Sequence, residues 1–122
     1  MRTDPQLIRE WIEGLNESGC LVVVEGVKDR RALQATGVTA RIMTLSRRAI
    51  YRIVEDVVAS GRDVVILTDI DAHGKRLYRL MVSELSQRGV RVDRKYREFL
   101  QTETPLDQIE GIRRYAQHCG LE

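Results

Sequence analysis

Two uninterrupted apolar runs, each followed closely by acidic residues, constrain this sequence more than any other feature. The first is LVVV at residues 21–24, and the second is VVIL at residues 64–67. Because no polar residue interrupts either run, both predict short strands that are covered on both faces. Strands of this kind are typical of parallel sheets that carry a helix layer on each side, so the runs favour an α/β fold.

Segments with helical spacing of apolar residues surround the two runs. They predict a three-layer α/β fold, Rossmann-like, with a mostly parallel central sheet of about four strands and helices on both faces. The predicted additional strands lie at residues 38–45 and 90–92. The predicted helices lie at residues 5–16, 28–35, 75–87 and 105–118, with a further helix that follows Ser46 as a candidate N-cap and ends at residues 60–61.

Composition limits the class of protein. A length of 122 residues is that of one domain, residues 1–122, with a single main core. The two cysteines, Cys20 and Cys119, match no metal-ligand spacing, and no segment approaches the roughly 18 apolar residues of a membrane span. We therefore expect a cytoplasmic protein with no membrane partner.

Carboxylates follow both predicted strands at the point where each strand ends. Glu25 follows the first run, and Asp69 and Asp71 follow the second. Because parallel strands present their carboxyl ends at one edge of a sheet, we expect these three acids to converge there. The carboxylates of Asp69 and Asp71 are hard oxygen ligands, which suit Mg²⁺, with Mn²⁺ as a substitute. Glu25 could then move a proton or help to hold metal.

Glycines and cations accompany the acids. Gly26 and Gly74 predict either close approach of a phosphate or a tight packing of backbone. The flanking basic side chains predict contacts with phosphates, because carboxylates alone would repel a phosphate. The candidates for this role are Lys28, Lys75, Arg76, Arg91 and Arg94.

The stretches VVVEGVKD and VVILTDIDAHGK together resemble the Toprim domain, which topoisomerases, bacterial-type primases and several nucleases share. The resemblance covers core motifs at residues 21–93, with the first and last helices as additions. By this resemblance Glu25 is the general acid or base, Asp69 and Asp71 bind Mg²⁺, and Asp29 is an accessory acid. The chain looks most similar to the small standalone Toprim proteins of archaea, which are themselves similar to the bacterial ribonuclease that matures 5S ribosomal RNA.

These features predict a Mg²⁺-dependent enzyme that cleaves phosphodiester bonds of RNA or DNA, for example in RNA processing. Two alternatives stay open. One is a Toprim module that binds metal and nucleic acid but needs a partner chain for turnover, and the other is an aspartyl-phosphate receiver or phosphatase, which would give no role to Glu25. Each acid also has a purely structural explanation, in helix capping or in helix-dipole stabilisation. Whether the chain forms a homodimer or binds a partner protein is left open.

Overall fold

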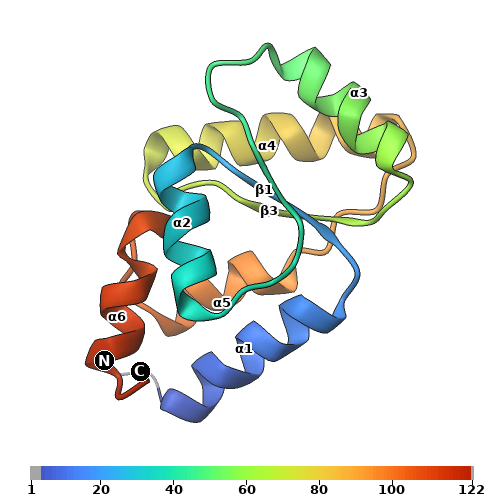
Figure 1. Ribbon diagram of the computed structural model, residues 1–122. Helices are drawn as coiled ribbons and strands as arrows, with labels where there is room; N and C mark the ends of the chain where they lie inside the picture. The colour runs from blue at the N-terminus through green and yellow to red at the C-terminus, as the bar shows by residue number, and fades with distance from the viewer. Residues whose placement is uncertain (1–3, 122) are drawn as a thin grey trace.

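A computed structural model describes residues 4–121 of the chain as an α/β fold with a three-stranded parallel sheet (Figure 1). The limits predicted for the domain at residues 1 and 122 lie outside the described residues. The elements in chain order are α1 (Pro5–Glu17), β1 (Leu21–Val24), α2 (Val27–Thr36), β2 (Ile42–Thr44), α3 (Ile50–Ser60), β3 (Val64–Leu67), α4 (Ala72–Gln87), α5 (Lys95–Glu103), the 3₁₀ turn η1 (Ile109–Gly111) and α6 (Ile112–His118).

The strand order is β2-β1-β3, so β1 lies at the centre of the sheet. Val24 pairs with Thr44 on one side and with Leu67 on the other, which aligns the carboxyl ends of all three strands. Every residue of β1 and β3 is buried, as the two apolar runs predict. The fold class predicted from the sequence is therefore confirmed.

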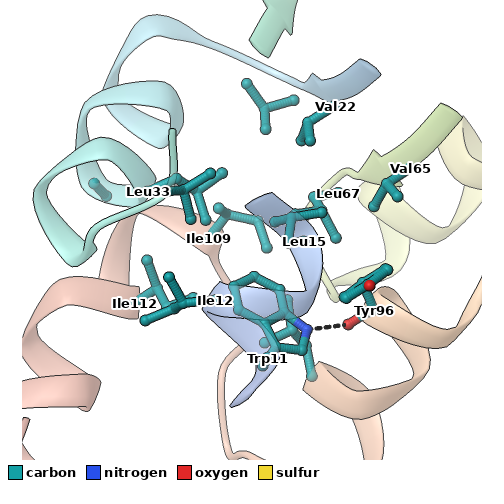
Figure 2. Close-up of a cluster of buried hydrophobic side chains, with 14 of the residues drawn as sticks. Trp11, Ile12, Leu15, Val22, Leu33, Val65, Leu67, Tyr96, Ile109 and Ile112 are labelled. Atoms are coloured by element: carbon teal, nitrogen blue, oxygen red, sulfur yellow. Dashed lines mark hydrogen bonds between the residues drawn. The ribbon is translucent and has the colours of Figure 1, made fainter. Parts of the chain in front are cut away.

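Helices cover both faces of the sheet because successive strand residues point to opposite sides. Val22 and Leu67 belong to a core beneath α1, α2, α5 and α6, and Figure 2 shows this cluster around Trp11. The indole Nε1 of Trp11 donates to the carbonyl oxygen of Tyr96 at 3.0 Å, which ties α1 to α5. Val23 and Ile66 belong to a second core beneath α3 and α4.

Four local expectations differ from the structure. The strand predicted at residues 90–92 is reduced to one parallel bridge, Val64 to Val92, because the chain leaves the sheet edge directly afterwards to form α5, a helix that was not predicted. The strand predicted at residues 38–45 is only Ile42–Thr44. The helix predicted after Ser46 begins at Ile50 with Ala49 as N-cap, since Ser46 and Arg47 both have positive φ. The helix predicted at residues 105–118 is η1 followed by α6.

Candidate functional site

Glu25 and Asp69 meet at the carboxyl edge of the sheet. Because β1 and β3 are neighbours in register, the residues that follow them emerge side by side. Oε2 of Glu25 accepts a hydrogen bond from the backbone N–H of Asp69 at 2.7 Å. The structure thus joins the two strand ends that the sequence analysis expects to converge.

Asp69 carries a carboxylate in an unfavourable electrostatic setting. Burial raises its pKa from 3.8 to about 6. A hydrogen bond from the N–H of Ile109 to Oδ1, at 2.8 Å, opposes that rise in pKa, while the negative charges of Glu25, Asp29 and Asp71 add to it. A bound cation would relieve this accumulation of negative charge.

Asp71 is the N-cap of α4. Its Oδ1 accepts from the N–H of Gly74 at 2.8 Å, so the helix begins at Ala72, three residues before the predicted start. This contact occupies one carboxylate oxygen, and the second oxygen has no hydrogen bond to a described residue. Capping and metal binding are therefore compatible at this side chain.

Asp29 lies deeper, on the first turn of α2, and is 7% exposed. Burial raises its pKa, the backbone N–H of Gly26 opposes the rise, and the charges of Glu25 and Glu110 add to it. Oδ2 accepts from that N–H at 2.9 Å. Asp29 thus fixes the loop after β1 while it contributes negative charge to the edge.

The two predicted loop glycines have different surroundings. A Cβ on Gly74 would lie 1.9 Å from the carbonyl oxygen of Asp69, so only glycine allows α4 to pack against the end of β3. Thr68 stabilises this packing of α4 against β3, because its hydroxyl donates a hydrogen bond to the carbonyl oxygen of Gly74 at 2.7 Å. Gly26 has extended backbone, and a Cβ there would meet only Oδ2 of Asp29, at 3.9 Å. Gly26 therefore leaves open space at the edge.

Arg97, on α5, supports the site from within the core and is 2% exposed. Its Nη2 donates to the carbonyl oxygens of Thr68 at 3.2 Å and Asp69 at 2.6 Å, and its guanidinium lies over the ring of Tyr78 at 4.5 Å. Burial lowers its pKa, and its Nε has no hydrogen-bond partner among residues 4–121. Arg97 was not among the candidate residues of the sequence analysis, and only its inward position in the structure reveals that it holds the Asp69 peptide.

A shallow cleft of about 380 Å³ lies over Glu25, Asp29 and Asp69, and Asp71 is not among its lining residues. Besides Glu25, Gly26, Asp29 and Asp69, its lining includes Lys28, which was predicted, and Gln108 and Glu110, which were not. The latter two come from the segment around η1, which carries no motif that could have identified them. Exposed His73 adds a cation when protonated, with Nε2 3.9 Å from Oε1 of Glu25.

The other predicted cations are distributed unevenly. Lys75 and Arg76 are exposed on the first two turns of α4, and Arg94 is exposed at the start of α5. Arg91 lies at the opposite edge of the sheet, where its backbone oxygen accepts from the N–H of Val64 and its side chain pairs with Asp63 at 2.9 Å. The structure therefore separates Arg91 from the acids.

The donor set suits an open metal site. Within residues 4–121, no group of three or more His, Cys, Asp or Glu side chains is arranged to hold a metal ion. Magnesium binds through one or two carboxylates and keeps several waters. Asp69 and Asp71 each retain one oxygen without a hydrogen bond to a described residue, and the charge of Asp71 contributes to the raised pKa of Asp69, so the two carboxylates are candidates to share one cation.

Comparisons with known proteins identify relatives whose names state no activity. The chain is 30% identical to a UPF0292 protein of Methanocaldococcus jannaschii over 97 residues, 77% of this chain and 76% of the relative. It is 39% identical to a UPF0292 protein of Thermococcus gammatolerans over 104 residues, 84% of this chain and 76% of the relative. A solved structure of an Aquifex aeolicus protein superimposes with a TM-score of 0.76 at 30% identity, covering 84% of this chain and 95% of that one. No family model matches the chain.

Proposed function

The chain belongs to the UPF0292 family, and since that name states no activity, we propose a function from the site: Mg²⁺-dependent, Toprim-like cleavage of phosphodiester bonds in nucleic acid. One observation carries the proposal. Adjacent parallel strands join Glu25 to Asp69 at an edge where several negative charges accumulate, and the carboxylate of Asp69 forms no salt bridge with a described residue. Metal-dependent phosphate chemistry is a common use of such carboxylates. The resemblance to Toprim motifs supports the same roles, with Glu25 as the general acid or base and Asp69 and Asp71 as the metal ligands.

Asp69 and Asp71 would hold the metal, which when bound supplies positive charge to the oxygens of the reacting phosphate. Residues of the chain itself hold the two carboxylates in place. The N–H of Ile109 and the capping contact with Gly74 each fix one oxygen of these carboxylates, so their orientation is set before any ligand arrives. Such preorganisation avoids a reorganisation cost during reaction.

Glu25 is the residue we assign to proton movement. The N–H of Asp69 fixes its Oε2, which leaves Oε1 to accept or give a proton on the side of His73. Its side chain is 21% exposed, so a substrate can reach it while much of its surface is shielded from water. A general acid or base must first lie within hydrogen-bond distance of the reacting oxygen.

Two further expectations from the sequence, that the protein has no membrane partner and that it is cytoplasmic, belong to this proposal. Within the described part of the chain no helix is long and apolar enough to cross a bilayer. We place the activity in the cytoplasm, where the free, buried thiols of Cys20 and Cys119 would remain reduced.

Cleavage of end-labelled structured RNA, single-stranded DNA and duplex DNA, each with Mg²⁺, Mn²⁺ or EDTA, tests the proposal. We expect metal-dependent cleavage that falls by about 100-fold or more in Glu25→Gln and in Asp69→Asn. Glu84→Gln, an exposed acid near the far end of α4, is the control and should keep the wild-type rate. Cleavage that persists in EDTA or in both site variants would refute the assignment.

The non-catalytic binding module is the second candidate function. In this candidate the carboxylates of Asp69 and Asp71 would bind metal, and further metal ligands would come from a substrate or a partner chain. Salt-sensitive nucleic-acid binding without any cleavage would select this candidate. Acid-labile phosphorylation of Asp69 or Asp71 by a small phosphodonor would instead select an aspartyl-phosphate mechanism.

A further inference from the structure

A second and larger groove, of about 800 Å³, adjoins the acidic cleft. It lies over α2, η1 and α6, and α2 packs against both η1 and α6; Figure 1 shows α2 and α6 side by side. Lys28, Gln108 and Glu110 line both the groove and the cleft. The two hollows therefore form one continuous surface that leads to Glu25 and Asp69.

Within residues 4–121, four exposed cations line this groove, against the two carboxylates of Asp107 and Glu110. Lys28 and Arg31 lie three residues apart and so share one face of α2, and Arg113 and Arg114 lie on α6. None of the four forms a salt bridge with a described carboxylate, whereas Arg48 and Arg91 elsewhere are paired with Asp56 and Asp63. Unpaired cations gathered in a concave surface are free to bind an anion.

The lining also indicates how a ligand would be bound. Among the described residues no aromatic side chain lines the groove, so bases have no aromatic platform there on which to stack. Arginine guanidinium groups match the geometry of phosphate oxygens. The groove therefore suits a phosphodiester backbone held without reading its sequence.

We infer that the groove formed by Lys28, Arg31, Arg113 and Arg114 is the track along which a nucleic-acid strand enters the acidic cleft. This inference rests on the proposed function, because the cleft at its end is where the strand would be cut. According to this inference, α2 and α6 are the main elements that bind the nucleic-acid backbone, in place of the segment around Arg91 and Arg94 that the sequence predicts. The C-terminal helix thereby gains a role that no motif in the sequence indicates.

Binding measured in EDTA tests the inference without requiring metal or cleavage. The probes are a structured RNA, a single-stranded DNA and a duplex DNA of equal length, titrated by fluorescence anisotropy over a range of salt concentrations. The test protein is R113Q/R114Q, in which two exposed positions are changed. The matched control is R62Q/R88Q, which removes the same charge at the opposite edge of the sheet, where Arg62 donates to the carbonyl oxygen of Gly19.

We expect R113Q/R114Q to weaken binding by about 10-fold or more and to lower the slope of log affinity against log salt by about 2, one for each lost phosphate contact. The control should change affinity by less than about 2-fold and leave the slope unchanged. The probe whose affinity falls most in R113Q/R114Q identifies the class of nucleic acid that the groove binds.

Three results would overturn the inference. The first is that the protein binds none of the nucleic-acid probes, and the second is that the two double variants weaken binding equally. The third result is that poly-glutamate binds as tightly as the nucleic acids and that R113Q/R114Q abolishes this binding. The last would identify an acidic protein as the ligand of the groove. Failure here and failure of the proposed function are distinguishable. Cleavage with unchanged affinity in R113Q/R114Q refutes only the groove, whereas groove-dependent binding without cleavage refutes only the catalytic proposal.

Discussion

At the scale of single residues, Gly26 and Gly74 show how one residue type serves two purposes within one site. Gly74 is required by a contact between two segments of backbone, and Gly26 faces open space in the cleft. The sequence predicts both glycines as loop positions but cannot distinguish them, because the distinction depends on where α4 starts relative to β3. That start is set by the capping bond of Asp71.

Substitution by alanine separates the two glycines. Gly74→Ala should lower the free energy of unfolding by about 2 kcal/mol or more, because its Cβ collides with the carbonyl oxygen of Asp69. Gly26→Ala should lower it by less than about 1 kcal/mol, since its Cβ enters open space at an extended position. Urea denaturation of both variants checks this expectation, and equal losses would contradict the assigned surroundings.

Asp69 makes stability depend on pH in a definite direction. Its folded pKa of about 6 lies above the value of 3.8 for an unperturbed aspartate, so the folded state binds the proton more tightly than the unfolded state does. Deprotonation of Asp69 therefore lowers the free energy of unfolding as pH rises from about 4 to about 6, with no further loss above that range. Near pH 4 the carboxyl group of Asp69 is protonated and uncharged in the folded state, so its burial lowers the free energy of unfolding very little.

In EDTA, Asp69→Asn should therefore raise the melting temperature relative to wild type at pH 7.5 and leave it nearly unchanged at pH 4. The exposed carboxylate of Asp107 offers a control, and Asp107→Asn should show no such difference between the two pH values. Thermal denaturation at both pH values measures the effect. A gain that is equal at pH 4 and pH 7.5 would show that the charge of Asp69 is not its cause.

At the scale of secondary structure elements, α5 illustrates what an apolar pattern cannot reveal. The inward face of this helix consists of Tyr96, Arg97 and Leu100, so a charged residue stands where the helical pattern would have an apolar one. Arg97 is tolerated there because the carbonyl oxygens of Thr68 and Asp69 accept its hydrogen bonds. These partners come from another part of the chain, so the segment appears in the sequence as a basic loop.

Arg97→Met should lower the free energy of unfolding by about 2 to 4 kcal/mol, because it leaves these two carbonyl oxygens without their buried donor. Arg94→Met, at an exposed position on the same helix, should change it by less than about 1 kcal/mol. Guanidinium denaturation of the two variants makes the comparison. A fully stable Arg97→Met protein would remove the supporting role assigned to Arg97.

At the scale of the whole molecule, the sequence predicts what depends on local pattern. The two apolar runs identify the central strands, and parallel pairing then predicts that Glu25 and Asp69 meet, which the hydrogen bond between them shows. The C-terminal third was predicted less well. Its contribution to the site, through Ile109, Gln108 and Glu110, depends on how the segment after α5 folds back onto α2, and no local pattern encodes that contact.

We propose that the carboxyl edge of the sheet binds a divalent cation. Paramagnetic broadening of backbone amide NMR signals by Mn²⁺ at less than one equivalent is the first measurement to make. We expect the amide signals of Gly26, Asp69 and Gly74 to broaden first, while those of Asp63 and Arg91 at the opposite edge stay sharp.

The variant D69N/D71N should abolish the broadening and keep the fold, since asparagine caps a helix about as well as aspartate. Broadening confined to the carboxyl edge in wild type and absent from the variant would establish the site. No broadening at that edge, or the same broadening in D69N/D71N, would show that Asp69 and Asp71 do not bind the cation.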